Sequence, residues 1–257
     1  MNTMREKIID PTFDYSQPWF YRNKLSLRCE LGIGQGKEYF DNASKRAMKI
    51  ANILFENKKI DAAFYVEYFI DGKACEVGSF DINIDEVIDL DMNVLHEMGM
   101  IDEDIETAKR YISYDIDFAV LEGIIKNQIE NQYSPLVSFV SFDNQFIFSV
   151  YDDRGCDIVF FCEDKYVEFY PKLKDYFLDY DREKMKGTFE SICSVCDECG
   201  SKFIKAKSQM MSLCPECAHI LFGYENCNHQ FKDGKCELCH WDGSRSDYIK
   251  TLVENNK

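Results

Sequence analysis

Long apolar runs are missing from this sequence. Residues 1–16 lack the apolar stretch of a secretory signal peptide, and no segment approaches the roughly 18 consecutive apolar residues of a transmembrane helix. Internal repeats and low-complexity linkers are missing as well. We therefore expect a soluble, cytoplasmic protein that does not use a membrane as a partner.

Histidine is scarce in the first 190 residues, where His96 is the only one. We find no Ser-His-Asp or Cys-His combination there that would serve nucleophilic catalysis. We assign no catalytic residue and lean towards a protein that is not an enzyme.

Positive charge is in short supply. The chain has 30 Lys and Arg against 46 Asp and Glu, and residues 1–190 carry 22 of the first kind against 37 of the second, a net charge of −15. Such a surface repels nucleic-acid phosphates and could attract a basic protein partner. A solvated acidic surface without any partner explains the same charge, because net charge reports on solubility and association rather than on fold.

The apolar content is nevertheless sufficient for a folded core. Apolar residues make up 46% and aromatic residues 14% of the 257 residues, which leaves room for one sizeable domain and a small appendage. Periodicity predicts strands at residues 25–31, 62–70, 136–142, 145–151 and 156–162, and helices at residues 41–56, 102–112, 116–131 and 165–178. Short loops between the last three strands predict an antiparallel meander. We expect an α+β fold with a mixed or antiparallel sheet flanked by helices.

Cysteine is concentrated near the C-terminus. Eight of the 12 cysteines lie within residues 193–239, and three of the four histidines lie within residues 219–240. In a cytosolic chain, closely spaced cysteines indicate metal binding rather than disulfides. No thioredoxin-like βαβ pattern surrounds them, which argues against a redox role.

Two Cys-x-x-Cys pairs form the first candidate site. Cys196/Cys199 and Cys214/Cys217 are separated by 14 residues, which is the spacing of a zinc ribbon. Two tight turns bring four soft thiolates to one zinc ion. Cys193 with Cys196 is an alternative first pair, but the glycine after Cys199 favours Cys196/Cys199 because a zinc-binding turn ends in a residue that tolerates positive φ.

A second candidate site follows directly. Cys227 and His229 are separated by six residues from Cys236 and Cys239, with an Asp-Gly turn midway. Four protein ligands leave no open position for a catalytic water, so we predict two structural zinc ions. Both sites are complete without the remaining histidines of the region, His219 and His240.

These patterns predict three parts of the chain. Residues 1–187 form the acidic α+β domain, residues 188–224 form the zinc ribbon, and residues 225–257 form a second small zinc-binding module. The two modules are too small for a large core, so we expect zinc to stabilise them.

Two features of the acidic domain invite a chemical interpretation. Gly32, Gly34 and Gly36 precede a helix and could cradle a phosphate, but the spacing is neither a dinucleotide-binding nor a P-loop pattern, which favours an ordinary loop. Two acidic motifs with arginine are either functional or architectural, and their residues are Asp152, Asp153, Arg154, Asp179, Asp181 and Arg182.

Several of these residues carry a family resemblance. They lie in Arg28-Cys29-Glu30-Leu31-Gly32, Arg46-Ala47, Tyr151-Asp152-Asp153-Arg154-Gly155 and Leu178-Asp179-Tyr180-Asp181-Arg182. Over roughly residues 20–185 the chain resembles the bacterial domain-of-unknown-function family 3885, with the zinc-ribbon segment added behind it. The resemblance implies a Rossmann-like fold and a bacterial or phage origin, and it implies no mechanism.

Three functions follow, in order of preference. The first is a non-enzymatic zinc-binding interaction protein whose acidic domain binds a protein partner, and an immunity- or inhibitor-like role is one version of it. The second is an enzyme or binding domain for a phosphorylated small molecule, with a site made from Gly32–Gly36, Arg154 and Arg182.

The third function is nucleic-acid binding through the ribbon. Lys202, Lys205 and Lys207 alternate along its sequence. Three lysines are few against an overall charge of −16, so this function ranks last.

Overall fold

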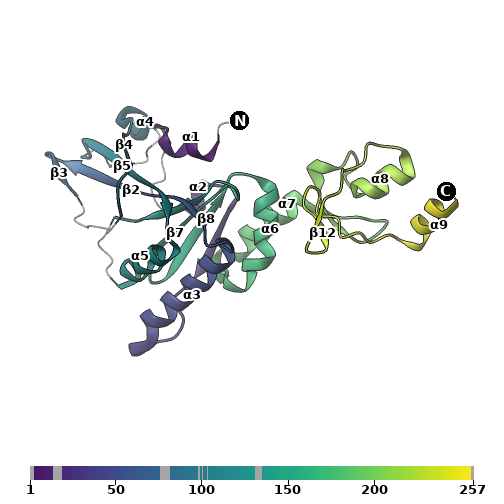
Figure 1. Ribbon diagram of the computed structural model, residues 1–257, viewed down its shortest axis with the longest axis horizontal. Coiled ribbons are helices and arrows are strands. Elements are labelled where there is room, and N and C mark those ends of the chain that lie inside the picture. Colours follow the sequence, from purple (N-terminus) through teal and green to yellow (C-terminus); the bar gives the residue numbers. More distant parts are fainter. Residues whose placement is uncertain are drawn as a thin grey trace. The chain divides into compact units, whose positions relative to one another are not determined.

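The computed structural model describes residues 3–13, 19–75, 82–97, 99, 101–102, 104–130 and 135–255 (Figure 1). The chain forms two compact units. The first unit comprises Met1–Phe161 and Pro171–Arg182, and the second comprises Cys162–Tyr170 and Glu183–Lys257. Within the described residues, every helix is too short or too polar to span a bilayer.

An antiparallel sheet forms the centre of the first unit. Its strands lie in the order β1 (Ser26–Glu30), β8 (Gly155–Phe160), β7 (Phe146–Asp152), β6 (Ser138–Ser141), β2 (Ile60–Ile70), β5 (Thr107–Ile116) and β4 (Glu86–Asp89), with β3 (Lys73–Ala74) paired to β2. Each strand pair among the described residues is antiparallel. The predicted α+β class and the β6–β7–β8 meander are confirmed. A Rossmann-like arrangement, which rests on parallel strands, is not.

Helices cover this sheet where the sequence places an apolar stripe. Helix α3 (Tyr39–Leu54) turns its alanines, isoleucine and leucine inward, and α5 (Phe118–Glu130) lies beside it and contacts β7 (Figure 1). The short helices α1 (Met4–Ile9), α2 (Trp19–Arg22) and α4 (Met92–Glu97) complete the unit. Helices expected at residues 41–56 and 116–131 are therefore present.

One prediction in this unit is wrong. Residues 102–112 were expected to be helical, but most of them belong to strand β5. Ala108, Arg110 and Ile112 face the core at the two-residue period of a strand. The guanidinium of Arg110 is buried because it donates hydrogen bonds to the carbonyls of Ile8 and Asp10, at 2.8 and 3.1 Å. An arginine in a core position conceals the apolar alternation on which strand prediction depends.

The second unit is built from short helices and two small hairpins. It includes most of α6 (Glu163–Leu173) and α7 (Arg182–Ile192), the hairpins β9 (Cys193–Val195) with β10 (Lys202–Ile204) and β11 (Phe231–Lys232) with β12 (Lys235–Cys236), and the helices α8 (Pro215–Phe222) and α9 (Asp247–Asn255). Its buried cluster is unusual because half of the ten fully buried members are cysteines, alongside Phe203, Leu213, Ala218, Trp241 and Ile249.

Candidate metal centres

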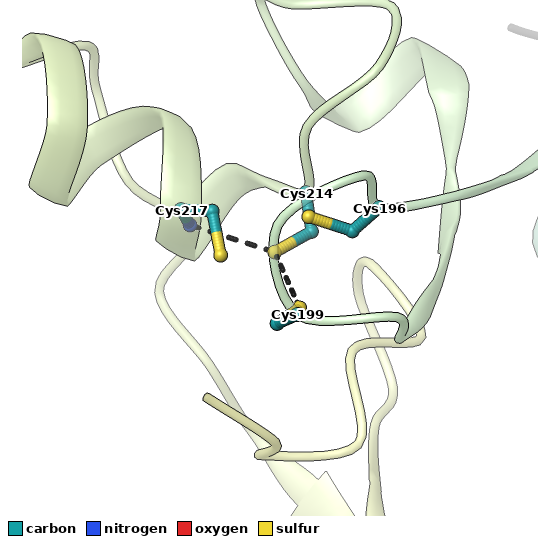
Figure 2. Close-up of side chains that lie close together, drawn as sticks. All are labelled: Cys196, Cys199, Cys214 and Cys217. Carbon is teal, nitrogen blue, oxygen red and sulfur yellow. Dashed lines mark hydrogen bonds between the residues drawn. The ribbon is translucent and has the colours of Figure 1, made fainter. Parts of the chain in front are cut away.

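The first cysteine group joins a loop to a helix start. Cys196 and Cys199 lie on the turn after β9, which Gly200 closes at φ +72°. Cys214 is the N-cap of α8, and Cys217 follows in the first helical turn. Figure 2 shows the four side chains gathered between this turn and the beginning of α8, and their sulfur atoms all lie within 4.8 Å of one another.

The second group is built around the single hairpin formed by β11 and β12. Cys227 and His229 precede β11, Cys236 ends β12, and Cys239 follows on a turn. The tight connection uses Asp233 and Gly234, both with positive φ. The four ligand atoms again lie within 4.8 Å of one another.

The distances between the ligand atoms of each group test whether zinc fits. A tetrahedral site with Zn–S bonds of about 2.3 Å and a Zn–N bond of about 2.0–2.1 Å has S···S edges of about 3.8 Å and an S···N edge of about 3.5 Å. The Sγ atoms of Cys199 and Cys214 are 3.7 Å apart, and those of Cys227 and Cys236 are 3.8 Å apart. Nδ1 of His229 is 3.5 Å from Sγ of Cys239. Both donor sets therefore have the chemistry and the spacing of a four-coordinate zinc site.

Electrostatics within the first group favour a cation. Hydrogen bonding by the Cys217 thiol lowers the pKa of Cys214 to about 6. Burial raises the pKa of Cys199 to about 12, and the bond to the Cys214 sulfur raises that of Cys217 strongly. The thiolate of Cys214 is thus stable beside the thiols of Cys199 and Cys217, which hold their protons. A divalent ion would displace those protons, so metal binding is coupled to proton release.

The second group has the same asymmetry. Burial opposes ionisation of Cys236, but hydrogen bonds from the His229 ring and from backbone N–H groups outweigh burial and lower the pKa to about 6. Burial raises the pKa of Cys239 and, less strongly, of Cys227. Backbone N–H groups also point at sulfur in both groups, from Cys217 to Cys214 at 3.5 Å and from Leu238 to Cys236 at 3.4 Å. Such contacts orient thiolate ligands.

A buried carboxylate lies beside both groups, and the sequence pattern did not reveal it. Glu216 sits between Cys214 and Cys217 and is 5% exposed. Burial raises its pKa, but hydrogen bonds from Asn226 and Arg245 outweigh burial and lower the pKa below the usual 4.5. The only sequence signal was a glutamate inside a Cys-x-x-Cys pair, and Glu198 holds the same place in the other pair.

The remaining cysteine and histidines of the region lie outside the two groups. Cys193 is buried in β9, opposite Ile204. Nδ1 of His219 is 2.7 Å from the carbonyl of Tyr224. His240 follows Cys239 in a left-handed conformation, φ 66°, and burial lowers its pKa. The first group therefore contains Cys196 and Cys199, and Cys193 lies outside it.

The acidic motifs of the first unit are tied into its framework. The guanidinium of Arg28 binds both carboxylate oxygens of Asp157 at 2.8 Å and lies 4.0 Å from Asp181, whose carboxylate also accepts from the Tyr21 hydroxyl at 3.2 Å. The rings of Phe20, Tyr21 and Tyr151 surround the same guanidinium. This buried network attaches the segment around Asp181 to strands β1 and β8.

The two arginines proposed for a phosphate site are engaged locally. Arg154 is exposed and pairs with Asp152 in its own turn. Arg182 binds Asp179 at 2.9 Å and donates to the carbonyls of Lys174 and Phe177 at 2.9 and 3.1 Å.

The predicted glycine loop has a steric explanation. A Cβ atom on Gly32 would lie 2.1 Å from the hydroxyl oxygen of Tyr39, so the position must be glycine for this tyrosine to fit. Gly34 and Gly36 have positive φ, of 95° and 83°. Steric fit and positive φ thus account for the glycines in the turn into α3.

The three ribbon lysines also have partners. Lys202 lies over the ring of Phe189, 5.5 Å from its centroid, and Lys207 pairs with Asp164 at 3.3 Å. The ammonium of Lys205 donates to the carbonyl of Glu190 at 2.8 Å and so caps helix α7. These contacts join the ribbon to helices α6 and α7 within the second unit.

Comparisons with known proteins locate the family part of the chain. A family model described as a domain of unknown function (DUF3885) matches residues 5–181. No curated protein and no solved structure matches the chain. The matched stretch contains the whole antiparallel sheet and ends before both cysteine groups. Because this match covers more than half of the sequence, the chain belongs to the DUF3885 family.

Proposed function

We propose that the chain is a non-enzymatic zinc-binding interaction protein. Two structural zinc ions hold the second unit, one bound by Cys196, Cys199, Cys214 and Cys217, and the other by Cys227, His229, Cys236 and Cys239. The gathering of four soft ligand atoms within 4.8 Å in each group carries this proposal, and the three distances given above match the edges of a tetrahedral zinc site. Bound zinc supplies a fixed cross-link, and four protein ligands leave no position for a reacting water.

Counting metal ions tests the zinc proposal. Native mass spectrometry of the full chain should find two zinc ions, and Cys199→Ser or Cys239→Ser should each reduce the count to one. Cys75→Ser is the matched control, since this cysteine is exposed and outside both groups. A wild-type chain without zinc, or a control that also loses an ion, would contradict the proposal.

The acidic N-terminal part of the chain supports a role in protein binding. Residues 1–190 carry a net charge of −15, which favours a basic partner, as in an immunity- or inhibitor-like complex. Affinity purification from the native host tests this role. We expect one basic protein to be retained at low salt and its on-rate to fall as salt rises. Recovery of no specific partner would remove the support for the proposal.

Three further expectations remain predictions. They are the cytoplasmic location, the bacterial or phage origin, and independent folding of residues 1–187, 188–224 and 225–257. Expression of residues 188–257 alone tests the last of these. Failure of that fragment to bind two zinc ions would show that the boundary lies elsewhere.

A further inference from the structure

Glu216 is part of the first cysteine group by position. It occupies the first turn of α8 between Cys214 and Cys217, and 5% of its surface is exposed. The turn that presents these two sulfur atoms therefore also fixes the carboxylate. Two other contacts hold it, because Nε of Arg245 donates to Oε1 at 3.0 Å and Nδ2 of Asn226 donates to Oε2 at 2.7 Å.

The same carboxylate faces the histidine of the second group. Oε2 of Glu216 lies 3.5 Å from Nε2 of His229, while Nδ1 of that ring lies 3.5 Å from Sγ of Cys239. Nε2 is buried and makes no full hydrogen bond within the described part of the chain. A neutral imidazole has one bare nitrogen and one N–H. When Nδ1 binds the metal ion, the N–H belongs at Nε2, where the carboxylate is its acceptor.

A second route leads from Glu216 to the same group. Asn226 donates to Glu216 through Nδ2 and accepts, through Oδ1, the backbone N–H of Cys227 at 2.8 Å. Glu216 therefore reaches two of the four ligands of the second group, His229 directly and Cys227 through Asn226. Outer contacts of this kind fix the orientation of metal ligands.

We propose that Glu216 is a positioning residue that couples the two metal groups, so that filling the first group raises the affinity of the second. Forming the first group fixes the Cys214–Cys217 turn and with it the carboxylate. The fixed carboxylate holds His229 with Nδ1 towards the sulfur atoms and holds the backbone of Cys227. This inference rests on the proposed zinc binding, and the two fail in different ways in the test below.

Cobalt(II) titration of the metal-free full chain tests the coupling. Four-thiolate and three-thiolate-plus-imidazole sites give different ligand-field spectra, so each group is followed separately, and zinc competition gives both affinities. We expect Glu216→Ala to weaken the second site about 10–100-fold, the range seen when outer contacts are removed, with a much smaller change at the first site. Glu216→Gln keeps an acceptor oxygen and should restore part of the loss.

Two controls separate the role of Glu216 from general destabilisation. Glu198 occupies the corresponding place in the other Cys-x-x-Cys pair and bonds Ser246 instead of a ligand, so Glu198→Ala should leave the second site unchanged. Cys196→Ser with Cys199→Ser disrupts the first group and should weaken the second site in the wild type but not further in Glu216→Ala. Imidazole ¹⁵N shifts should show metal at Nδ1 and a proton at Nε2 of His229.

The outcomes are distinct. Equal second-site affinity in wild type and Glu216→Ala, or the same loss in Glu198→Ala, would overturn the coupling while the zinc proposal stands. A wild-type chain that binds neither cobalt nor zinc would overturn the zinc proposal itself. If Glu216→Ala does not fold, Glu216→Gln is the deciding variant. A loss of metal affinity confined to the second site supports the coupling, and no loss overturns it.

Discussion

Removal of metal should unfold the cysteine-rich part of the chain and leave the first unit intact. A strong chelator is the perturbation, and residues 191–245 are the part expected to lose structure. The reason lies in the buried cluster of the second unit, where five of ten members are cysteines of the two groups. Without zinc, weak hydrogen bonds replace metal–sulfur bonds between sulfur atoms that lie 3.7–3.8 Å apart in the core.

The folding free energy that zinc supplies is large compared with the stability of a domain. Structural zinc contributes about 10–16 kcal/mol of apparent folding free energy per site. A whole domain is stable by only about 5–15 kcal/mol. Loss of both ions therefore exceeds the stability of a typical domain, and the second unit should lose its fold.

The chain offers a direct assay, because it has only two tryptophans and one lies in each unit. Trp19 is 2% exposed in the first unit. Trp241 is 4% exposed in the second, where its ring packs 4.7 Å from that of His229 and its Nε1 donates to the carbonyl of Ser244 at 2.9 Å. Trp19→Phe and Trp241→Phe variants each report on one unit. On chelation, emission from Trp241 should shift to the red, whereas emission from Trp19 should not move.

A specific result would refute this reasoning. If metal analysis shows that the ions are gone and Trp241 emission is unchanged, the second unit folds without zinc. If Trp19 emission shifts together with that of Trp241, the first unit depends on metal as well. Return of the Trp241 signal on adding zinc distinguishes reversible unfolding from oxidation of the thiols.

Three further predictions concern other parts of the molecule. Arg28→Met removes the ion-pair partner of the fully buried Asp157 and should destabilise the first unit by about 3–5 kcal/mol in urea denaturation. The control Arg154→Met, on the surface, should change stability by less than about 0.5 kcal/mol. Equal effects of the two variants would refute the structural role of the Arg28–Asp157 pair. Lys205→Met removes the C-terminal cap of α7 and should lower the stability of the second unit by about 0.3–1 kcal/mol, and no change in its thermal midpoint would contradict this role. Burial and a hydrogen bond to Glu67 raise the pKa of Tyr111 from 10.0 to about 12. Its contribution to stability is therefore complete below pH 10 and is lost as pH rises through 12. Urea denaturation midpoints measured against pH should fall less steeply at alkaline pH in Tyr111→Phe.

Local signals predicted much of this structure correctly. The meander and the helices α3 and α5 could be predicted because their apolar periods are regular and their turns are short. The cysteine groups could be predicted because Cys-x-x-Cys pairs are brought together by local turns. Strand β5 could not, since buried Arg110 satisfies its charge with carbonyls about 100 residues away in sequence. Glu216 was missed for the same reason, because its partners Asn226, His229 and Arg245 become neighbours only in the folded chain.

The division of the chain between the units has a consequence for inheritance. The second unit draws residues 162–170 from inside the stretch matched to the DUF3885 family, and the rest from residue 183 onward. Recombination at one junction behind the family domain would thus transfer the cysteines without the first part of α6. A design that moves the whole second unit to another protein must therefore include residues 162–170 as well as the cysteine-rich sequence.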